Sequence, residues 1–288
     1  MSPETRPHPD PATLTEPEPL ADVVLVATDL DGTLLGETST ISERAVRAIA
    51  AARGAGIHVV PVTGRPPMSV WALAESGGLG PLGVCSNGGI VVDLESNQIL
   101  EMEPIEGPVA GELIEIVRTA RPGVLFALDD MEKFCFEPSF IPEGRTRSGR
   151  AREVSDIGEM AADGCVKLIA RHPGTDAVTL MRHLQDHIGD AAHVTSSGLD
   201  WVEIMAPGVS KANAVARVCR RLGIDRAQVV AIGDNYNDLP LLDWAGPGHA
   251  MAPANAVDAI LEVVGRVLPT NIEDGVAVLL EELVALRG

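Results

Sequence analysis

The chain has 288 residues, of which 45% are apolar and only 3% aromatic, and its formal net charge is −19 at pH 7. That length allows one large domain or two modest ones, with a core built from Val, Leu, Ile and Ala. The negative charge argues against nucleic acid and anionic membrane surfaces as partners, because both attract basic proteins. The sequence contains no uninterrupted run of about 18 apolar residues, so no membrane span is predicted.

Residues 1–20 are predicted to be a disordered tail outside the fold. They contain six prolines and several acidic residues, and they lack the apolar segment of a signal peptide. The four cysteines, Cys85, Cys135, Cys165 and Cys219, are scattered and form no Cys-x-x-Cys pair. This pattern favours buried free thiols and a reducing, cytoplasmic location.

The first ninety residues alternate between strand and helix. Apolar runs at 23–27, 57–62 and 82–86 predict strands, and helices are expected from the cap Ser42 to Gly54 and over 67–76. This alternation predicts right-handed crossovers and a parallel sheet.

The pattern changes over residues 90–205. A hairpin is expected from the runs 90–93 and 99–102 around a turn at 95–97. Further strands are expected at 124–128, 133–137, 165–170, 192–196 and 201–205, with helices near 108–120 and 175–188. The first pattern then returns, with a helix at 210–222, a strand at 229–232, a short helix near 237–244, a strand near 249–251 and a terminal helix. We therefore predict an α/β fold: a doubly wound, Rossmann-like core of residues 21–89 and 206–288, interrupted by an inserted α+β domain at 90–205.

Polar residues follow three of the core strands. Because ligands bind at the carboxyl ends of parallel strands, we expect Asp29, Thr63 and Asp234 to converge. Asp29 and Asp31 are spaced to point the same way and repel each other unless a cation compensates. With Asp238 added, several oxygens and no Cys or His cluster favour Mg²⁺ over Zn²⁺.

A phosphate group would need positive partners beside these carboxylates. Lys211 offers a charge, Thr63 a hydroxyl, and the turns after the strands offer backbone N–H groups. The simpler interpretation is that Asp29 and Asp31 only cap a turn, and for an isolated Asp-x-Asp it would be preferred. The combination with Thr63, Lys211 and Asp234, in this order, favours a phosphate site.

Four segments together resemble the signature motifs of the haloacid dehalogenase superfamily. They are Asp29-Leu30-Asp31-Gly32-Thr33-Leu34-Leu35, Val62-Thr63-Gly64-Arg65, Lys211 and Gly233-Asp234-Asn235-Tyr236-Asn237-Asp238. Ser86-Asn87-Gly88-Gly89 and Glu273-Asp274-Gly275-Val276-Ala277 are similar to segments of its Cof-type sugar-phosphatase branch. The resemblance covers about residues 22–286 and implies that the inserted domain is a cap that selects the leaving group.

The resemblance also implies catalytic roles. Asp29 would be the nucleophile that becomes phosphorylated, and Asp31 the general acid and base. Mg²⁺ would bind the carboxylates of Asp29 and Asp234 and the backbone carbonyl of Asp31.

Other motif residues would bind the phosphoryl group or support the site. Thr63, Gly64, Lys211 and Asn237 would hold the phosphoryl oxygens. Asp238 would orient Lys211 or a water on the metal. Arg65 would contact the substrate or support the site from farther out, with a surface ion pair at a helix start as the alternative.

Two segments depart from the pattern of the branch. Lys211 is followed by Ala212 where glycine is usual, and Ala252-Pro253 replace Gly-Asn after Met251, with Asn255 two residues later. The resemblance therefore does not predict the geometry of the loop after Met251, beside the expected metal site.

The predicted function is hydrolysis of small phosphate monoesters, such as sugar or related metabolite phosphates, by a monomer or weak homodimer. Alternatives are a phosphomutase of the same superfamily and a non-catalytic sugar-phosphate sensor. Residues 90–205 contain 21 acidic and 10 basic residues, a difference of 11 negative charges, which should disfavour polyanionic substrates. The arginine run at 145–152 is either a solvated loop or a substrate contact.

Overall fold

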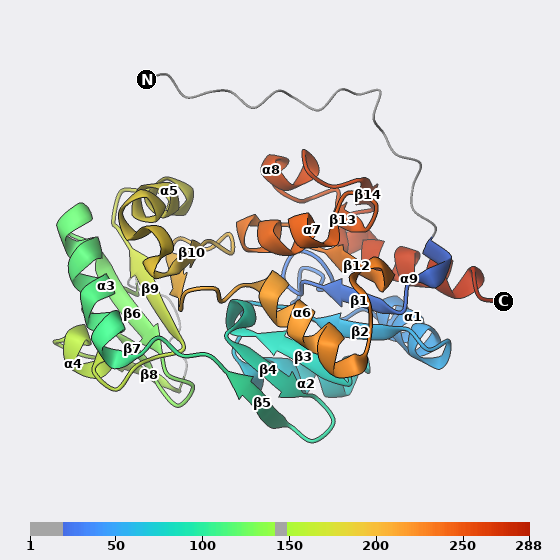
Figure 1. Ribbon diagram of the computed structural model, residues 1–288, viewed down its shortest axis with the longest axis horizontal. Helices are drawn as coiled ribbons and strands as arrows, with labels where there is room; N and C mark the ends of the chain where they lie inside the picture. Colours follow the sequence, from blue (N-terminus) through green and yellow to red (C-terminus); the bar gives the residue numbers. More distant parts are fainter. Residues whose placement is uncertain (1–19, 142–148) are drawn as a thin grey trace.

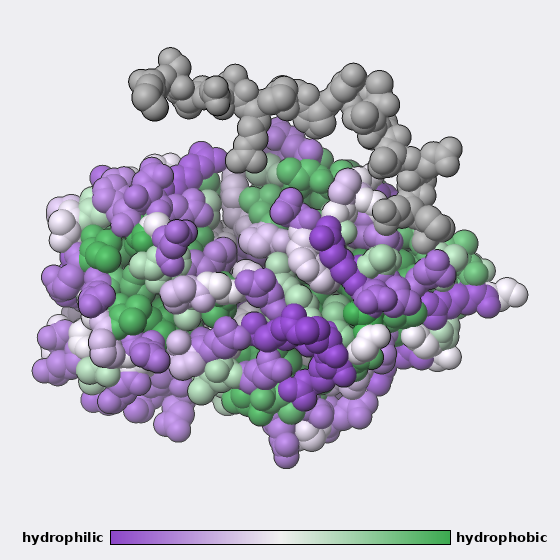
Figure 2. Space-filling view, in the orientation of Figure 1, coloured by the Kyte–Doolittle hydropathy of each residue, from purple (hydrophilic) through white to green (hydrophobic). Residues whose placement is uncertain are grey.

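The structure is a computed structural model that describes residues 20–141 and 149–288. Figure 1 shows two bodies side by side along the long axis, connected by the segments after β5 (Gln98–Met102) and β11 (Val202–Met205). Hydrophilic residues predominate on the face shown in Figure 2, where apolar residues form separate small groups. Within the described ranges, no helix is long and apolar enough to cross a membrane.

The core is built on a five-stranded sheet with the order β14-β13-β12-β1-β2. Its strands are β1 (Leu25–Thr28), β2 (His58–Pro61), β12 (Val229–Ile232), β13 (Ala250–Pro253) and β14 (Arg266–Leu268). Every neighbouring pair is parallel, and β1, which lies between β12 and β2, aligns Leu25 with Val229 on one side and with His58 on the other. The parallel core predicted from the sequence is therefore confirmed for β1, β2, β12 and β13, and β14 is an addition to it. The strand predicted at 82–86 is present but belongs to a separate antiparallel sheet, and a parallel bridge between Val62 and Val84 links it to the end of β2.

Helices cover both faces of this sheet, because successive strand residues point to opposite sides. Val26 packs into a cluster with α1 (Glu43–Gly54), α2 (Pro67–Gly77) and α9 (Gly275–Ala285). Its neighbours Leu25 and Ala27 pack into a second cluster with α6 (Lys211–Leu222), α7 (Leu239–Ala245) and α8 (Asp258–Leu261). This is the doubly wound arrangement that was predicted.

A small antiparallel sheet lies beside the core. It consists of β3 (Leu82–Cys85), β4 (Ile90–Asp93) and β5, and a bond from Thr63 N–H to Val84 O at 2.9 Å ties β3 to the end of β2. The predicted hairpin is present as β4 and β5. The predicted insert began at residue 90 and so included this hairpin. In the structure, however, β4 pairs with β3 and not with a strand of the insert's sheet.

The insert contains a six-stranded sheet with the order β10-β11-β9-β6-β7-β8. Besides β11, its strands are β6 (Leu125–Asp129), β7 (Phe134–Phe136), β8 (Ala151–Glu153), β9 (Lys167–Arg171) and β10 (His193–Thr195). Neighbours are antiparallel, except that β7 and β8 are parallel. The predicted strands and helices are present, whereas β8 and α4 (Ile157–Ala161) were not predicted.

Among the described residues of the insert, helices cover one face of its sheet. Residues such as Leu168 and Ile204 pack there against α3 (Gly107–Ala120), α4 and α5 (Ala177–Ile188). Alternate residues, including Lys167, Ile169 and Glu203, point to the other face and line a pocket shared with the core. In Figure 1, α3 and α5 lie on the outer side of this sheet, away from the core.

Candidate active site

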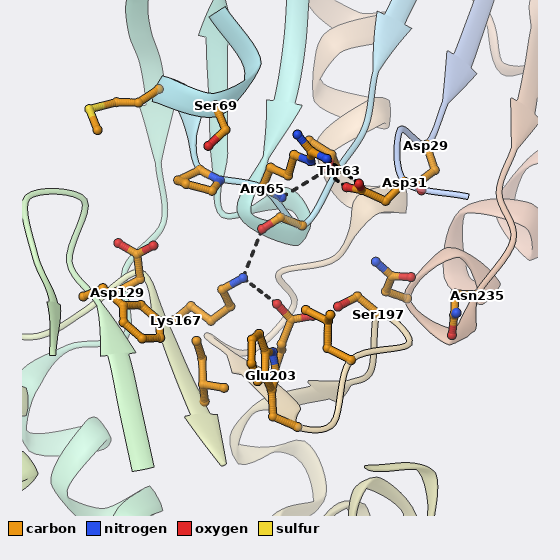
Figure 3. A pocket seen from close by; sticks show the side chains of 18 of the residues that line it. Asp29, Asp31, Thr63, Arg65, Ser69, Asp129, Lys167, Ser197, Glu203 and Asn235 are labelled. Carbon is orange, nitrogen blue, oxygen red and sulfur yellow. Dashed lines mark hydrogen bonds and ion pairs between the residues drawn. The ribbon is translucent and has the colours of Figure 1, made fainter. Parts of the chain in front are cut away.

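Polar residues from three neighbouring strands meet at the carboxyl edge of the core sheet. Asp29, Thr63 and Asp234 follow β1, β2 and β12, and all three line one pocket. The Asp29 N–H donates to the carbonyl of Ile232 at 2.9 Å, which fixes the end of β1 against the end of β12. The predicted convergence is present, and Figure 3 shows Asp29, Asp31 and Thr63 on the core side of the cavity.

Lys211 forms a buried ion pair with two carboxylates. It is the first residue of α6, which begins after Ser210, whose hydroxyl accepts from Asn213 N–H at 3.2 Å. Its Nζ lies 2.6 Å from Oδ1 of Asp29 and 2.6 Å from Oδ1 of Asp238. Burial alone would lower the pKa of Lys211, but the charges of Asp238 and Asp29 outweigh burial and raise it. The ammonium is therefore a fixed positive charge beside Asp29.

Three buried carboxylates form a cluster suited to a divalent cation. Oxygens of Asp29, Asp234 and Asp238 lie within 4.8 Å of one another. Lys211 offsets one of their three negative charges, so two remain uncompensated. Burial holds the pKa of Asp29 well above its usual range despite Lys211, and burial together with Asp238 raises the pKa of Asp234 to about 6. A donor set made only of oxygens fits a hard ion such as Mg²⁺.

The three carboxylates differ in how many of their oxygens the protein already uses. Asp238 accepts from Lys211 through Oδ1 and from the N–H groups of Asp234 and Asn235 through Oδ2, at 3.0 and 3.1 Å. Asp234 accepts from the Thr33 hydroxyl at 2.9 Å through Oδ1. This arrangement suits Asp29 and Asp234 as direct metal ligands, with Asp238 as their support.

The turn after Asp29 approaches Asp234 closely. Gly32 has a φ of +79°, and a Cβ on it would lie 2.5 Å from Oδ2 of Asp234, so only glycine fits. The amide of Asn255 donates to the Gly32 carbonyl at 2.7 Å and accepts from Asn271 N–H at 2.9 Å. Asn255 thus supports the turn after Asp29, and it lies in the segment where the sequence departs from the usual pattern.

Asp31 and Arg65 form a two-pronged ion pair at the mouth of the site. Nε of Arg65 donates to Oδ2 of Asp31 at 2.7 Å, and a second guanidinium nitrogen contacts Oδ1. The Asp31 side chain is 53% exposed, and both residues line the pocket. The ion pair that was the alternative prediction for Arg65 is thus present, and its partner is Asp31, the predicted general acid and base.

Three of the four predicted phosphate-binding residues line the same pocket, whereas Lys211 is buried behind Asp29 and is not among the lining residues. The Thr63 hydroxyl accepts from Arg65 N–H at 3.1 Å, which leaves its own proton free for a ligand. The amide of Asn237 donates to Asn87 Oδ1 at 3.1 Å, and its own Oδ1 has no hydrogen-bond partner among the described residues. Gly64 and Asn237 line the pocket together with Thr63.

Two charged residues of the insert reach the same loops, and the sequence analysis missed both. Nζ of Lys167 lies 2.5 Å from Oε1 of Glu203 and 3.0 Å from the Gly64 carbonyl, as Figure 3 shows. Oε2 of Glu203 accepts from the amide of Asn87 at 3.0 Å. The available signal was one charged residue inside each of two apolar strand segments, 165–170 and 201–205.

The pocket between core and insert has a volume of about 750 Å³ and one strongly apolar wall. Phe134, Ile169 and Trp201 contribute to this wall from the insert. The ring centroids of Trp201 and Phe140 lie 6.0 Å apart, and those of Phe140 and Phe134 lie 6.4 Å apart. With Phe136, these rings account for four of only eight aromatic residues in the chain. Phe134 and Trp201 therefore present rings to the pocket, and the buried Phe136 and Phe140 pack behind them.

The arginine run of the insert is only partly described. Arg145 and Arg147 lie outside the described residues. Arg150 lines the pocket, but its guanidinium pairs with Asp129 at 3.0 Å and donates to the Glu132 carbonyl at 3.2 Å. Arg150 is thus held by the loop between β6 and β7.

Comparisons with known proteins agree with this geometry. The sequence matches the family of haloacid dehalogenase-like hydrolases over residues 26–280. Pyridoxal phosphate phosphatase YbhA of Escherichia coli is 27% identical over 269 residues, covering 88% of this chain and 96% of that protein. The 5-amino-6-(5-phospho-D-ribitylamino)uracil phosphatase YitU of Bacillus subtilis is 28% identical over 268 residues, covering 91% and 98%.

A solved structure gives the same fold. The sugar phosphatase BT4131, of subclass IIB of this superfamily, superposes with a TM-score of 0.74 at 17% identity, covering 90% of this chain and 98% of that one. The family match over most of the chain confirms the resemblance read from the motifs. The chain belongs to the haloacid dehalogenase-like hydrolases and is an enzyme of the phosphatase type.

Proposed function

We propose that the protein is a magnesium-dependent phosphatase that hydrolyses small phosphate monoesters through a phosphorylated Asp29. The observation that supports this most directly is the buried Asp29 carboxylate at the end of β1, held 2.6 Å from Lys211 and clustered with Asp234. A protein that only bound a sugar phosphate would have no need of such a nucleophile, which disfavours the sensor hypothesis.

The proposed reaction has two displacements at phosphorus. An Asp29 oxygen attacks phosphorus, the bond to the alcohol oxygen breaks with its electron pair, and Asp31 gives a proton to the departing alkoxide. A water molecule then attacks the phosphorus of the aspartyl phosphate and loses a proton to Asp31. Inorganic phosphate leaves and the Asp29 carboxylate is restored. Because Arg65 binds both oxygens of Asp31, this pair must loosen before Asp31 can act.

The carboxylate cluster supports Mg²⁺ as the cofactor. Asp29 and Asp234 would hold it through their carboxylates, and Asp31 through its backbone carbonyl. A bound cation would offset the excess negative charge and favour the ionised form of Asp29, whose pKa burial raises. When bound, Mg²⁺ supplies electrostatic shielding between the carboxylate and the phosphate and stabilises charge that develops in the transition state.

The remaining motif residues would hold the phosphoryl oxygens. Lys211 supplies charge, Thr63 a hydroxyl proton, and the loop at Gly64 a backbone N–H. Asn237 carries a second amide hydrogen besides the one donated to Asn87. Asp238 would act indirectly, because both of its oxygens already orient Lys211 and the backbone of the metal loop.

The substrate proposed is a sugar phosphate or a related small metabolite phosphate. The relatives YbhA and YitU are named for pyridoxal phosphate and for a phosphorylated ribitylaminouracil, both small phosphorylated metabolites. The apolar wall around Trp201 and Phe134 suits an alcohol portion that presents a flat or apolar face. We place the enzyme in the cytoplasm on the basis of its four buried free cysteines.

The decisive experiment measures phosphate release from a broad panel of monoesters, with Mg²⁺ and with EDTA. We expect turnover to require Mg²⁺ and to disappear in Asp29→Asn while the melting profile stays cooperative. Folded Asp29→Asn protein with more than a few per cent of wild-type turnover would remove Asp29 from this role. A phosphomutase would instead isomerise a hexose phosphate and release little inorganic phosphate.

A further inference from the structure

A chain of four buried polar side chains connects the insert to the loops of the phosphate site. Lys167 on β9 and Glu203 on β11 come from the insert and are 6% and 2% exposed. Asn87, after β3, and Asn237, after β12, come from the core and are 1% and 5% exposed. The proposed chemistry assigns no role to Lys167, Glu203 or Asn87.

The charge of Glu203 dictates which way the two amides point. A carboxylate can only accept hydrogen bonds, so the nitrogen of Asn87 must face Oε2 of Glu203, at 3.0 Å. The oxygen of Asn87 is thereby turned toward Asn237, whose nitrogen faces it at 3.1 Å. Burial alone would raise the pKa of Glu203, but the charge and hydrogen bond of Lys167 outweigh burial and lower it, which keeps Glu203 ionised. Glu203 therefore orients Asn237 through Asn87.

The other end of the pair acts on the loop that holds Thr63. Nζ of Lys167 donates to the Gly64 carbonyl at 3.0 Å. That carbonyl and the N–H of Arg65 belong to one planar peptide group, and the N–H donates to the Thr63 hydroxyl at 3.1 Å. Holding this peptide plane keeps the Thr63 oxygen occupied as an acceptor and its proton directed to a ligand.

Stability alone does not explain this pair. Desolvation of two buried charges opposes their attraction, and well-packed apolar residues often replace such pairs without loss of stability. Glu203 and Lys167 lie on neighbouring strands of the insert, yet both extend to core loops beside the phosphate site. A role in orienting those loops accounts for both contacts.

We propose that Lys167 and Glu203 are positioning residues for the phosphoryl group, although they belong to the insert that covers the leaving group. Through them, docking of the insert's sheet sets the orientation of Asn237 and Thr63. The inference rests on the proposed function, because that function assigns phosphoryl oxygens to Asn237 and Thr63. It predicts that losing either residue weakens phosphate binding whatever alcohol the substrate carries.

The test compares Glu203→Gln and Lys167→Met with the wild type in two measurements. The first is the dissociation constant of inorganic phosphate in the presence of Mg²⁺, measured by calorimetry without turnover. The second is kcat/KM for three monoesters with different alcohols. We expect phosphate binding to weaken by roughly 10-fold to 100-fold, as when a buried group loses its partner. We expect kcat/KM to fall by a similar factor for all three esters.

Glu137→Gln is the matched control within the insert. Glu137 forms an ion pair with Arg118 at 2.6 Å and accepts from Phe126 N–H, and it does not line the pocket. We expect Glu137→Gln to lower the melting temperature and to leave the phosphate dissociation constant within twofold of wild type.

A double variant, Lys167→Met with Glu203→Leu, separates positioning from stability. Each single variant leaves one buried charge without its partner, whereas the double variant replaces both charges by apolar side chains. We therefore expect its melting temperature to lie above those of the single variants, while phosphate binding stays weak. Recovery of phosphate affinity together with stability would overturn the proposal. So would folded single variants that bind phosphate within twofold of wild type but change the ranking of the three alcohols. If the wild type hydrolyses none of the esters, the proposed function fails, and the calorimetric comparison still decides the positioning role.

Discussion

In the absence of divalent cations, replacing Asp234 by asparagine is expected to stabilise the protein. The substitution removes one of three clustered carboxylates, against which Lys211 supplies one positive charge. Asparagine keeps an oxygen that can accept from the Thr33 hydroxyl, now 2.9 Å from Oδ1 of Asp234. The change therefore relieves repulsion with little loss of hydrogen bonding.

The size of this effect follows from the shifted ionisation of Asp234. Its pKa rises from 3.8 to about 6, and one pKa unit corresponds to about 1.4 kcal/mol. Ionised Asp234 therefore destabilises the metal-free folded state by about 3 kcal/mol at neutral pH. This destabilisation is complete above pH 6, decreases as the pH falls toward 3.8, and is absent below that value, because the folded state binds the proton more tightly. For a chain of this size, 3 kcal/mol raises the melting temperature by about 6–12 °C.

Scanning calorimetry of wild type and Asp234→Asn in EDTA, at pH 7.5 and at pH 4.5, measures this difference. We expect the variant to melt higher at pH 7.5 and the gap to shrink at pH 4.5. With Mg²⁺ the order should reverse, because the wild type gains binding energy that the variant lacks. Asp243→Asn, an exposed change on α7, is the control and should change stability by less than about 0.5 kcal/mol. An Asp234→Asn protein that melts below wild type in EDTA at pH 7.5 would refute this reasoning.

Three further substitutions test the site. Asp31→Asn should reduce turnover by roughly 10²–10⁴-fold, the usual contribution of a positioned acid–base group. The loss should be smaller for p-nitrophenyl phosphate, because its leaving group needs less protonation. Equal losses on alkyl and aryl esters would argue against Asp31 as the acid. Gly32→Ala places a Cβ 2.5 Å from Oδ2 of Asp234, so the Mg²⁺ concentration for half-maximal activity should rise by about 10-fold or more. Trp201→Leu should change kcat/KM most for esters with ring-bearing alcohols, by about 2-fold to 10-fold, and Trp244→Leu, outside the pocket, should not.

The core and the strand-end residues could be predicted because their signals are local. The strands that carry the site, β1, β2 and β12, are short apolar runs, and Asp29, Thr63 and Asp234 follow within two residues of their ends. The rule that ligands bind at the carboxyl ends of parallel strands then places these residues together without knowledge of their contacts. Ser42 was similarly readable as a helix cap, and its hydroxyl accepts from Ala45 N–H at 3.0 Å.

Other features depend on which elements become neighbours, which a local pattern does not reveal. Lys167 and Glu203 are 36 residues apart, and they meet because β9 pairs with β11. The sequence predicts that β4 and β5 form a hairpin, but the local residue pattern does not show that β4 also pairs with β3. Asn255 likewise acquires its role only because β13 is followed by a turn beside Gly32.

The net charge of the insert is a weaker guide to substrate choice than the pairing of charges inside the pocket. The acidic excess over 90–205 suggested that polyanions are repelled, but exposed charges beyond about 10 Å are largely screened. Among the described residues that line the pocket, the basic side chains are Arg65, Lys167 and Arg150. Each already has an acidic partner: Asp31, Glu203 and Asp129, respectively. Within the described residues, a second phosphate group would therefore have to break one of these ion pairs to bind a basic side chain, whereas an uncharged alcohol meets the apolar wall. Monophosphates should exceed bisphosphates and nucleotides in kcat/KM for this local reason.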